Sequence, residues 1–201
     1  MPWFDRSPKV LATYGLAALL ALTELVVMWQ TLHPNVSEDY RAYYITRTST
    51  CLPQPVTASY VLGETVDFTS NGDIEMAREL LPCGWEGPND DGRQSLGETS
   101  RMRFAVGPQQ DLRLELVLKG INLKDAGDRD VRLFAGEQPI GQAIVGAEDT
   151  ETFQFDVPAG AIKDGYLDLR FDFPNAIETS PGISNTYWRS VKLISAQLSP
   201  A

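Results

Sequence analysis

The chain has 201 residues, of which 43% are hydrophobic, and a net charge of −10 at neutral pH. This length accommodates one domain of ordinary size plus a small extra element. The charged residues within the first 32 positions cancel, so the whole acidic excess lies in residues 33–201. A surface of this charge repels phosphate groups, which excludes nucleic acid as a partner and disfavours a domain lying flat on anionic lipid.

An apolar run spans positions 10–32 and contains a single charged residue, Glu24. About 20 apolar residues cross the hydrocarbon core of a bilayer as a helix, whose backbone satisfies its own hydrogen bonds. Trp3 and Trp29 flank the run, as aromatic residues do at membrane interfaces. The sequence therefore predicts one transmembrane helix over residues 10–32, in contact with membrane lipid.

The charges on either side of this run predict its orientation. Arg6 and Lys9 precede the run, whereas Glu38 and Asp39 follow it. Basic residues stay on the cytoplasmic side, so we expect residues 1–9 to form a cytoplasmic tail. This pattern predicts a single-pass membrane protein whose C-terminal domain lies on the non-cytoplasmic side. A cleaved signal peptide is the alternative, but the run is long for one and lacks a small-x-small cleavage site at its end.

Four residues of the predicted helix indicate a protein partner within the membrane. Glu24 is an ionisable group in an apolar span, where such groups usually face protein or water. Ala17 and Ala21 form a small-xxx-small pair, with Gly15 nearby, and such pairs let helices approach closely. The predicted partner is an integral membrane protein complex. The alternative is that Glu24 reaches the outer interface by itself and that the pair is incidental.

The rest of the chain divides into a connector, residues 33–59, and a domain, residues 60–201. In the domain, apolar and polar residues alternate with period two between turns rich in Gly, Asn, Asp and Pro, which predicts strands with one apolar face. Strands are expected around residues 60–68, 102–104, 112–118, 131–133, 153–157, 167–173 and 191–198. The predicted fold class is all-β, an antiparallel, jelly-roll-like β-sandwich.

Three segments depart from this alternation. Residues 73–81 have a helical pattern that Pro82 ends, and Ile194 marks a change of register within the last strand. Tyr40, Tyr43 and Tyr44 cluster in the connector, where they either lie near the membrane surface or begin the sandwich as an edge strand.

The two cysteines, Cys51 and Cys83, both follow the apolar run. They either form a disulfide or stay separate as buried thiols. A location outside the cytoplasm favours the disulfide.

The residue inventory disfavours an enzyme. The single histidine, His33, directly follows the predicted helix, far in sequence from the sandwich. The chain contains no nucleophile elbow, no zinc-protease motif and no phosphate-binding loop. Two cysteines and one histidine do not supply a usual four-ligand structural zinc site. We therefore expect neither catalysis nor a cofactor.

Calcium is the best metal candidate. Asp125, Asp128 and Asp130 gather in one expected loop, and hard cations bind several oxygen ligands at once. Acidic loops are, however, most often solvated turns.

A glycan site would need aromatic rings that stack on sugar faces. Trp85, Tyr187 and Trp188 are the candidates for glycan contact. The alternative is that both tryptophans pack in the sandwich, as aromatic residues of β domains usually do.

Several short motifs resemble a β-sandwich domain found on bacterial membrane glycosyltransferases and related envelope proteins. Within residues 60–198 they are Cys83-Gly84-Trp85-Glu86-Gly87-Pro88, Ser95-Leu96-Gly97, Arg101-Met102-Arg103-Phe104, Phe173-Pro174-Asn175 and the stretch from Arg189 to Leu198. The resemblance implies a jelly-roll-like fold similar to carbohydrate-binding modules, and a fold by itself does not decide function.

Two functional hypotheses follow. In the first, the protein is a non-catalytic accessory subunit whose helix and β-sandwich dock on an integral membrane complex. In the second, it is a glycan-binding module of envelope polysaccharide or glycosyltransferase machinery.

Overall fold

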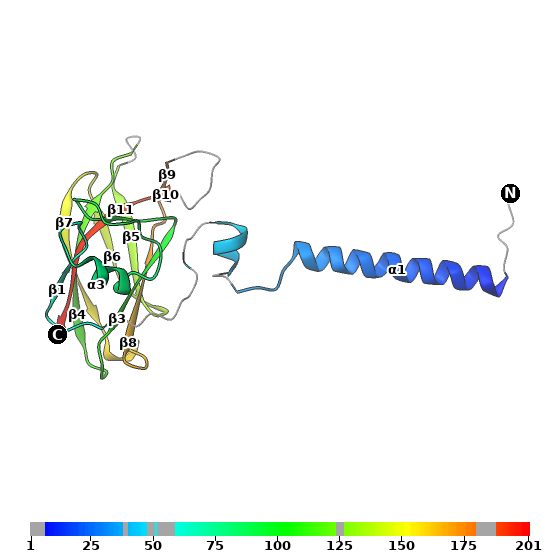
Figure 1. Ribbon diagram of the computed structural model, residues 1–201, viewed down its shortest axis with the longest axis horizontal. Coiled ribbons are helices and arrows are strands. Elements are labelled where there is room, and N and C mark those ends of the chain that lie inside the picture. The colour runs from blue at the N-terminus through cyan, green and yellow to red at the C-terminus, as the bar shows by residue number, and fades with distance from the viewer. Residues whose placement is uncertain (1–6, 38–39, 48–50, 52–58, 124–126, 180–187) are drawn as a thin grey trace. The chain divides into compact units, whose positions relative to one another are not determined.

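The structure is a computed structural model and describes residues 7–37, 40–47, 51, 59–123, 127–179 and 188–201. Two compact units make up the chain, Met1–Ser37 and Glu38–Ala201. The first contains one long helix, and the second contains every strand that the structure describes (Figure 1). The predicted fold class, an all-β domain with one N-terminal apolar helix, is therefore confirmed.

Helix α1 extends over Pro8–Leu32 and begins two residues before the predicted range. The Ser7 hydroxyl caps it by accepting a hydrogen bond from the Val10 N–H at 3.4 Å, and proline is well suited to the first turn. At 1.5 Å per residue the helix is about 38 Å long. Its length and its mean hydropathy of 2.0 allow it to cross a membrane, although a signal sequence meets the same criteria.

A single π-helical turn, η1 at Arg41–Ile45, lies in the predicted connector. The ring of Tyr44 packs there against two other tyrosines, with centroid distances of 4.6 Å to Tyr40 and 4.7 Å to Tyr43. These tyrosines form a turn of helix, so the expectation that they begin the sandwich as an edge strand is wrong.

The second unit is a sandwich of two antiparallel sheets (Figure 1). Sheet 1 has the order β1 (Thr65–Asp67), β11 (Val191–Pro200), β4 (Leu112–Gly120) and β7 (Thr150–Val157), and β2 (Arg93–Gln94) also pairs with β11. Sheet 2 has the order β3 (Thr99–Ala105), β8 (Tyr166–Asp172), β5 (Arg129–Ala135) and β6 (Gln138–Val145). Two short strands, β9 (Ile177–Glu178) and β10 (Trp188–Arg189), pair separately, and a 3-10 turn, η2 (Ala159–Ala161), follows β7. The predicted antiparallel sandwich is confirmed.

Alternate residues of both sheets form one apolar core. In β4, the leucines at positions 112, 114, 116 and 118 are buried, and the residues between them face outward. Sheet 2 contributes Met102, Phe104, Val131, Leu133, Leu167, Leu169 and Phe171. Burying each such side chain contributes about 1.5–3 kcal/mol, so this alternation is the main reason that the strands pair in this register.

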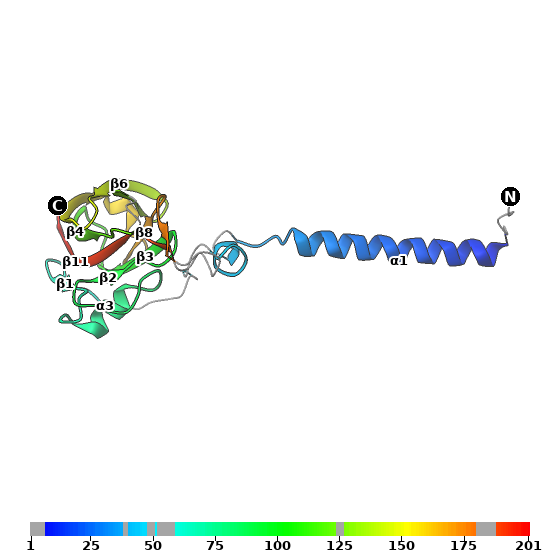
Figure 2. The same ribbon diagram turned by 90° about the horizontal axis from the view of Figure 1, so that it is seen from above.

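Helix α3, Ile74–Leu80, covers one side of the sandwich between the edge strands β1 and β3. The Asp73 carboxylate caps it by accepting a hydrogen bond from the Met76 N–H at 3.0 Å, and Ala77 and Leu80 are buried. Figure 2 shows α3 on the side of the sandwich opposite to β6. The helix predicted at residues 73–81 is confirmed and is one residue shorter at each end.

Two details of the strands bear on the prediction. The register of β11 against β4 shifts between Leu193 and Ser195, which confirms the change expected at Ile194. Strand β6 was missed, because Pro139 and Gly141 interrupt its alternation. A Cβ atom on Gly141 would lie 2.5 Å from the Phe155 ring, so the glycine lets β6 pack closely on β7.

Candidate ligand-binding face

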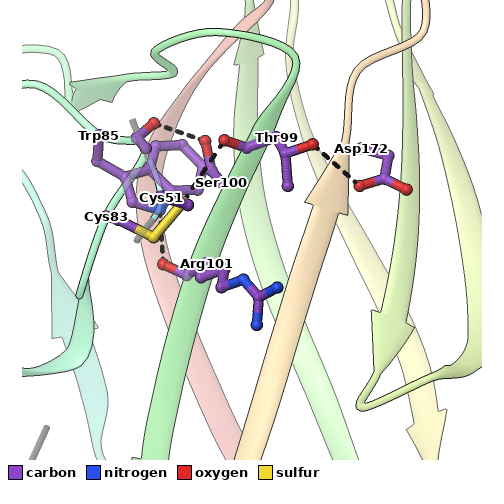
Figure 3. The surroundings of a disulfide bond; sticks show 8 residues. Cys51, Cys83, Trp85, Thr99, Ser100, Arg101 and Asp172 are labelled. Atoms are coloured by element: carbon purple, nitrogen blue, oxygen red, sulfur yellow. Dashed lines mark hydrogen bonds between the residues drawn. A yellow bond between two sulfur atoms is a disulfide. The ribbon is translucent and has the colours of Figure 1, made fainter. Parts of the chain in front are cut away.

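The structure joins Cys51 and Cys83 in a disulfide beside strand β3, with the two Cα atoms 4.8 Å apart. The Arg101 N–H donates to the carbonyl of Cys83 at 3.1 Å, and the sulfur of Cys51 lies 3.7 Å from the carbonyl oxygen of Thr99. Figure 3 shows this bridge against β3, with the Arg101 side chain directed away from it. The disulfide therefore fixes two distant chain segments to the edge of sheet 2.

The ring of Trp85 contributes to the packing of the sandwich. Its indole N–H donates to the carbonyl of Arg101 at 3.0 Å (Figure 3). The ring contacts Phe171 and Phe173 edge-on, with centroid distances of 5.4 and 6.3 Å. Gly84, with φ +80°, holds the preceding turn so close to Ser100 that a Cβ atom would clash at 2.4 Å. The structure thus places Trp85 where the packing alternative expected it.

The structure describes one of the other two aromatic candidates. Trp188 is half-buried in β10, paired with Glu178 of β9, and Tyr187 lies outside the described residues. The ring contacts recorded for Trp85 among the described residues are with Phe171 and Phe173.

The remaining motif residues also hold the fold together. The buried guanidinium of Arg189 forms an ion pair with Glu86. This contact connects the Gly-Trp-Glu loop to strand β10. The Asn175 side chain donates to the carbonyl of Asp128 at 2.9 Å and accepts from the Asp130 N–H at 3.0 Å. These motif residues connect loops of the sandwich, which explains why the motifs accompany this fold.

Of the three carboxylates proposed for calcium, that of Asp130 has other partners in the structure. Asp130 accepts from the Gln142 amide at 2.8 Å and lies 3.7 Å from Arg132. Asp125 lies outside the described residues. Among the residues that the structure describes, no group of three or more acidic, histidine or cysteine side chains is arranged to hold a metal ion.

The outer face of sheet 2 presents an array of charged side chains, which we name the arginine face. The alternation that buries Met102, Leu133 and Leu169 turns their neighbours outward. The arginine face comprises Arg101, Arg103, Asp130, Arg132, Asp168, Arg170 and Asp172 on β3, β5 and β8, with Phe134 and Tyr166 among them and Glu137 in the turn after β5.

Two guanidinium groups on this face are each held by a ring and a carboxylate. Arg103 lies 4.4 Å from the centre of the Tyr166 ring, and its Nε is 3.0 Å from Asp168. Arg170 lies 4.2 Å from the centre of the Phe134 ring, and its Nε is 3.2 Å from Asp172. Stacking and ion pairing together restrain a long side chain that would otherwise be mobile. The face thus presents planar cations in fixed positions.

The environment of Asp172 differs from that of a solvated carboxylate. Burial raises the pKa of Asp172, and the Arg170 guanidinium and the Thr99 hydroxyl, 3.4 Å away, offset that rise only in part. Electrostatic contacts on this part of the face are therefore less screened than on an open surface.

A hollow of about 200 Å³ opens on the arginine face. It is lined by Arg101, Gly136, Glu137, Asp168, Leu169 and Arg170. Donors from the guanidinium groups and acceptors from the carboxylates surround the same space, so this hollow can bind a polar ligand from several sides.

A larger hollow of about 390 Å³ lies over sheet 1. Its Asp91 carboxylate bridges Lys192, at 2.6 Å, and Lys119, at 3.1 Å, and hydrogen bonding from Lys192 is the main reason that the pKa of Asp91 is lowered. No aromatic residue lines this hollow, whereas both cation–π contacts among the described residues lie on the arginine face. We therefore regard the arginine face as the better candidate.

Sequence reasoning missed the arginine face, although a signal for it existed. Arg101 and Arg103 alternate with core residues, as do Asp168, Arg170 and Asp172. The alternation does not predict that β3 pairs with β8. This pairing brings the arginines of β3 beside the charged residues of β8.

The sequence matches no family profile and no curated protein. Among solved structures, it is similar to a family 36 carbohydrate-binding module in complex with calcium and xylotriose, at 12% identity over 56% of this chain and 82% of that one, with a TM-score of 0.37. It is also similar to the CBM36-1 domain of a multidomain xylanase from the hindgut metagenome of Trinervitermes trinervoides, at 12% identity, 69% and 97% coverage and a TM-score of 0.42. A third is the CBM6cm-2 module of Cellvibrio mixtus lichenase 5A in complex with cellotriose, at 10% identity, 70% and 99% coverage and a TM-score of 0.37. All three are carbohydrate-binding modules, the class of domain that the sequence motifs resemble.

Proposed function

We propose that this protein is a membrane-anchored, non-catalytic module that binds a glycan on its arginine face. The observation that carries this proposal is the hollow of about 200 Å³, which is lined by Arg101 and by Arg170, whose guanidinium is held between the Phe134 ring and the Asp172 carboxylate. A sugar hydroxyl is both a donor and an acceptor, so a face that offers fixed donors and fixed acceptors matches it. Strands hold these groups rigidly, which lowers the entropic cost of binding.

The anchor in this proposal is α1, with its N-terminus in the cytoplasm and the sandwich in the periplasm of a bacterial cell. The apolar character of α1 and the distribution of charges around it support this orientation. The Cys51–Cys83 disulfide also supports it, because disulfides persist in oxidising compartments.

Glycan binding is tested with the full-length protein in lipid nanodiscs, first on a glycan array and then by titration calorimetry with the strongest binder. We expect Arg170→Ala to weaken binding about tenfold or more, because hydrogen bonds from a charged donor are lost. Arg113→Ala is the matched control, since Arg113 pairs with Asp156 on the outer face of sheet 1. Equal effects of the two substitutions would contradict a site on the arginine face.

A second candidate function, an accessory subunit of an integral membrane complex, rests on α1. Ala17, Ala21 and Glu24 are spaced by four and three residues in a regular helix and therefore share one face, whereas Gly15 is on the opposite side from Glu24. A face of two small residues and one carboxyl suits a neighbouring helix. Glycan binding and docking are compatible in one protein.

Docking is tested by purification from native membranes in mild detergent, with mass spectrometry of the co-purifying proteins. We expect Glu24→Leu and Ala21→Leu each to reduce recovery of a multi-pass partner. Gly15→Ala is the control on the opposite side, where an added Cβ meets nothing within 4 Å in the structure. A multi-pass partner whose recovery is unaffected by all three substitutions would contradict the docking proposal.

A further inference from the structure

Arg170 is contacted on three sides, and the third contact differs from the other two. The plane of its guanidinium stacks on the Phe134 ring, and its Nε forms an ion pair with Asp172. Its terminal nitrogen Nη1 lies 3.4 Å from the carboxylate of Glu137. The Arg170 side chain is 25% exposed, but that of Glu137 is 94% exposed. The first two contacts fix the guanidinium, and the third connects it to a carboxylate that lies almost entirely in solvent.

An exposed ion pair of this kind contributes little, because solvent screening and side-chain entropy offset most of the attraction. Replacing the Glu137 carboxylate with another carboxylate therefore costs little. A ligand that brought its own carboxylate into the hollow would gain a charge-assisted hydrogen bond to a guanidinium that is already in place.

The neighbouring strand adds a second reason for an anion at this position. In the register of β3 and β8, Arg101 lies directly opposite Arg170, and both side chains line the hollow. Like charges directly opposite each other across a sheet are destabilising. Asp172 interacts with both guanidinium groups, and Glu137 and Asp168 also line the hollow. A ligand carboxylate that takes the place of Glu137 keeps this charge balance, whereas a neutral sugar in the same place does not.

The rings of the face do not favour a neutral sugar either. Neutral sugars are typically bound by stacking on an aromatic ring, and here the Phe134 and Tyr166 rings have guanidinium groups over them. One face of each ring is therefore already covered by a guanidinium.

Building on the proposed function, we propose that the glycan is a uronic-acid saccharide, that its carboxylate binds Arg170 in the hollow beside Arg101, and that Glu137 occupies the same position in the free protein as a built-in competitor. The specificity of the arginine face then comes from the contact between Arg170 and the ligand carboxylate. Competition from Glu137 lowers the affinity for that carboxylate. Removing the Glu137 charge should strengthen binding of acidic saccharides and leave neutral ones unaffected.

The test is a titration of the full-length protein in nanodiscs with tetragalacturonate and with the same oligomer after its carboxyl groups have been reduced to alcohols. We expect the acidic oligomer to bind about tenfold more tightly, since it alone accepts charge-assisted hydrogen bonds from Arg170. We expect Glu137→Gln to tighten its binding about twofold to fivefold, the range set by a surface ion pair, without affecting the reduced oligomer.

Asp156→Asn is the matched control, because it removes one negative charge and one exposed ion pair with an arginine, Arg113, on the other sheet. If it tightened binding as much as Glu137→Gln does, net charge would explain the effect and the competitor role would be overturned. Tetraglutamate serves as an acidic peptide, and binding as tight as that of tetragalacturonate would overturn the assignment to saccharides.

Failure of this inference is distinct from failure of the proposed function. A neutral saccharide that binds on the array with Arg170 dependence, together with equal binding of the acidic and reduced oligomers, would overturn the uronic-acid inference and leave glycan binding intact. Absence of binding by every saccharide, acidic or neutral, would overturn both.

Discussion

The outer faces of the two sheets have the same alternation of charged and apolar residues but differ in how the charges are held. On sheet 1, Arg113 and Asp156 meet at 3.5 Å with the carboxylate side chain 85% exposed. On sheet 2, Arg170 is restrained by Phe134 beneath it as well as by Asp172 beside it. An aromatic residue at an outward position converts a solvated ion pair into a positioned one.

We expect the largest losses of stability from substitutions in the shared core, and we expect them to be similar for the two sheets. We expect Leu116→Ala in sheet 1 and Leu133→Ala in sheet 2 each to lower the free energy of unfolding by about 2–5 kcal/mol, because both side chains are fully buried and their removal leaves a cavity. Chemical denaturation of the two variants measures this. A much smaller cost for one of them would mean that its sheet is only loosely packed.

A smaller effect should separate the outer faces. Phe134→Leu removes the ring under Arg170, and we expect it to lower stability by about 0.5–1 kcal/mol through the lost cation–π contact and to weaken glycan binding. Phe153→Leu is the control for losing a ring without losing a cation–π contact, since this half-buried ring packs against the core from sheet 1 and both cation–π pairs among the described residues lie in sheet 2. Glycan titrations that give the same affinity for both variants would contradict the role of the ring.

The smallest effect is a difference in pH dependence between two carboxylates. Burial raises the pKa of Asp172, so its ionised form costs stability that is recovered as pH falls from the raised pKa through the ordinary range of aspartate. Hydrogen bonding from Lys192 lowers the pKa of Asp91, so its contribution is present above the ordinary pKa and lost as pH falls through the lowered one.

Denaturation between pH 7 and about pH 3, around the ordinary pKa of aspartate, measures both effects. Relative to Asp172→Asn, the parent protein should gain stability as pH falls. Relative to Asp91→Asn it should lose stability. The same sign for both would show that the two carboxylates do not differ in environment.

Features that depend on residues close together in the sequence could be predicted, whereas features that depend on residues far apart in the sequence could not. Alternation identified most strands and the irregularity at Ile194, and a helical pattern identified the short helix, because these features depend on residues close together in the chain. Strand β6 escaped because Pro139 and Gly141 hide its period, and the reason for the glycine is the ring of Phe155 on another strand.

The candidate site could not be derived in the same way. That Arg103 would meet Asp168, or that Phe134 would lie under Arg170, depends on the pairing of β3, β8 and β5, which connects residues far apart in sequence. Conversely, Trp85 and Asn175 were conspicuous in the sequence, and their described contacts hold loops and core together. Prominent residues in a small sandwich often secure its loops, whereas a site can consist of ordinary residues on neighbouring strands.

The disulfide beside β3 also decides how the sandwich would respond to mechanical tension. If α1 is held in a membrane and the domain is pulled by what it binds, tension travels along the chain to Cys51 and crosses directly to Cys83. The chain between the two cysteines, which includes β1 and α3, is thereby bypassed by the load. The sandwich would then be pulled at one fixed point on the edge of sheet 2, and β1 would not be peeled from β11.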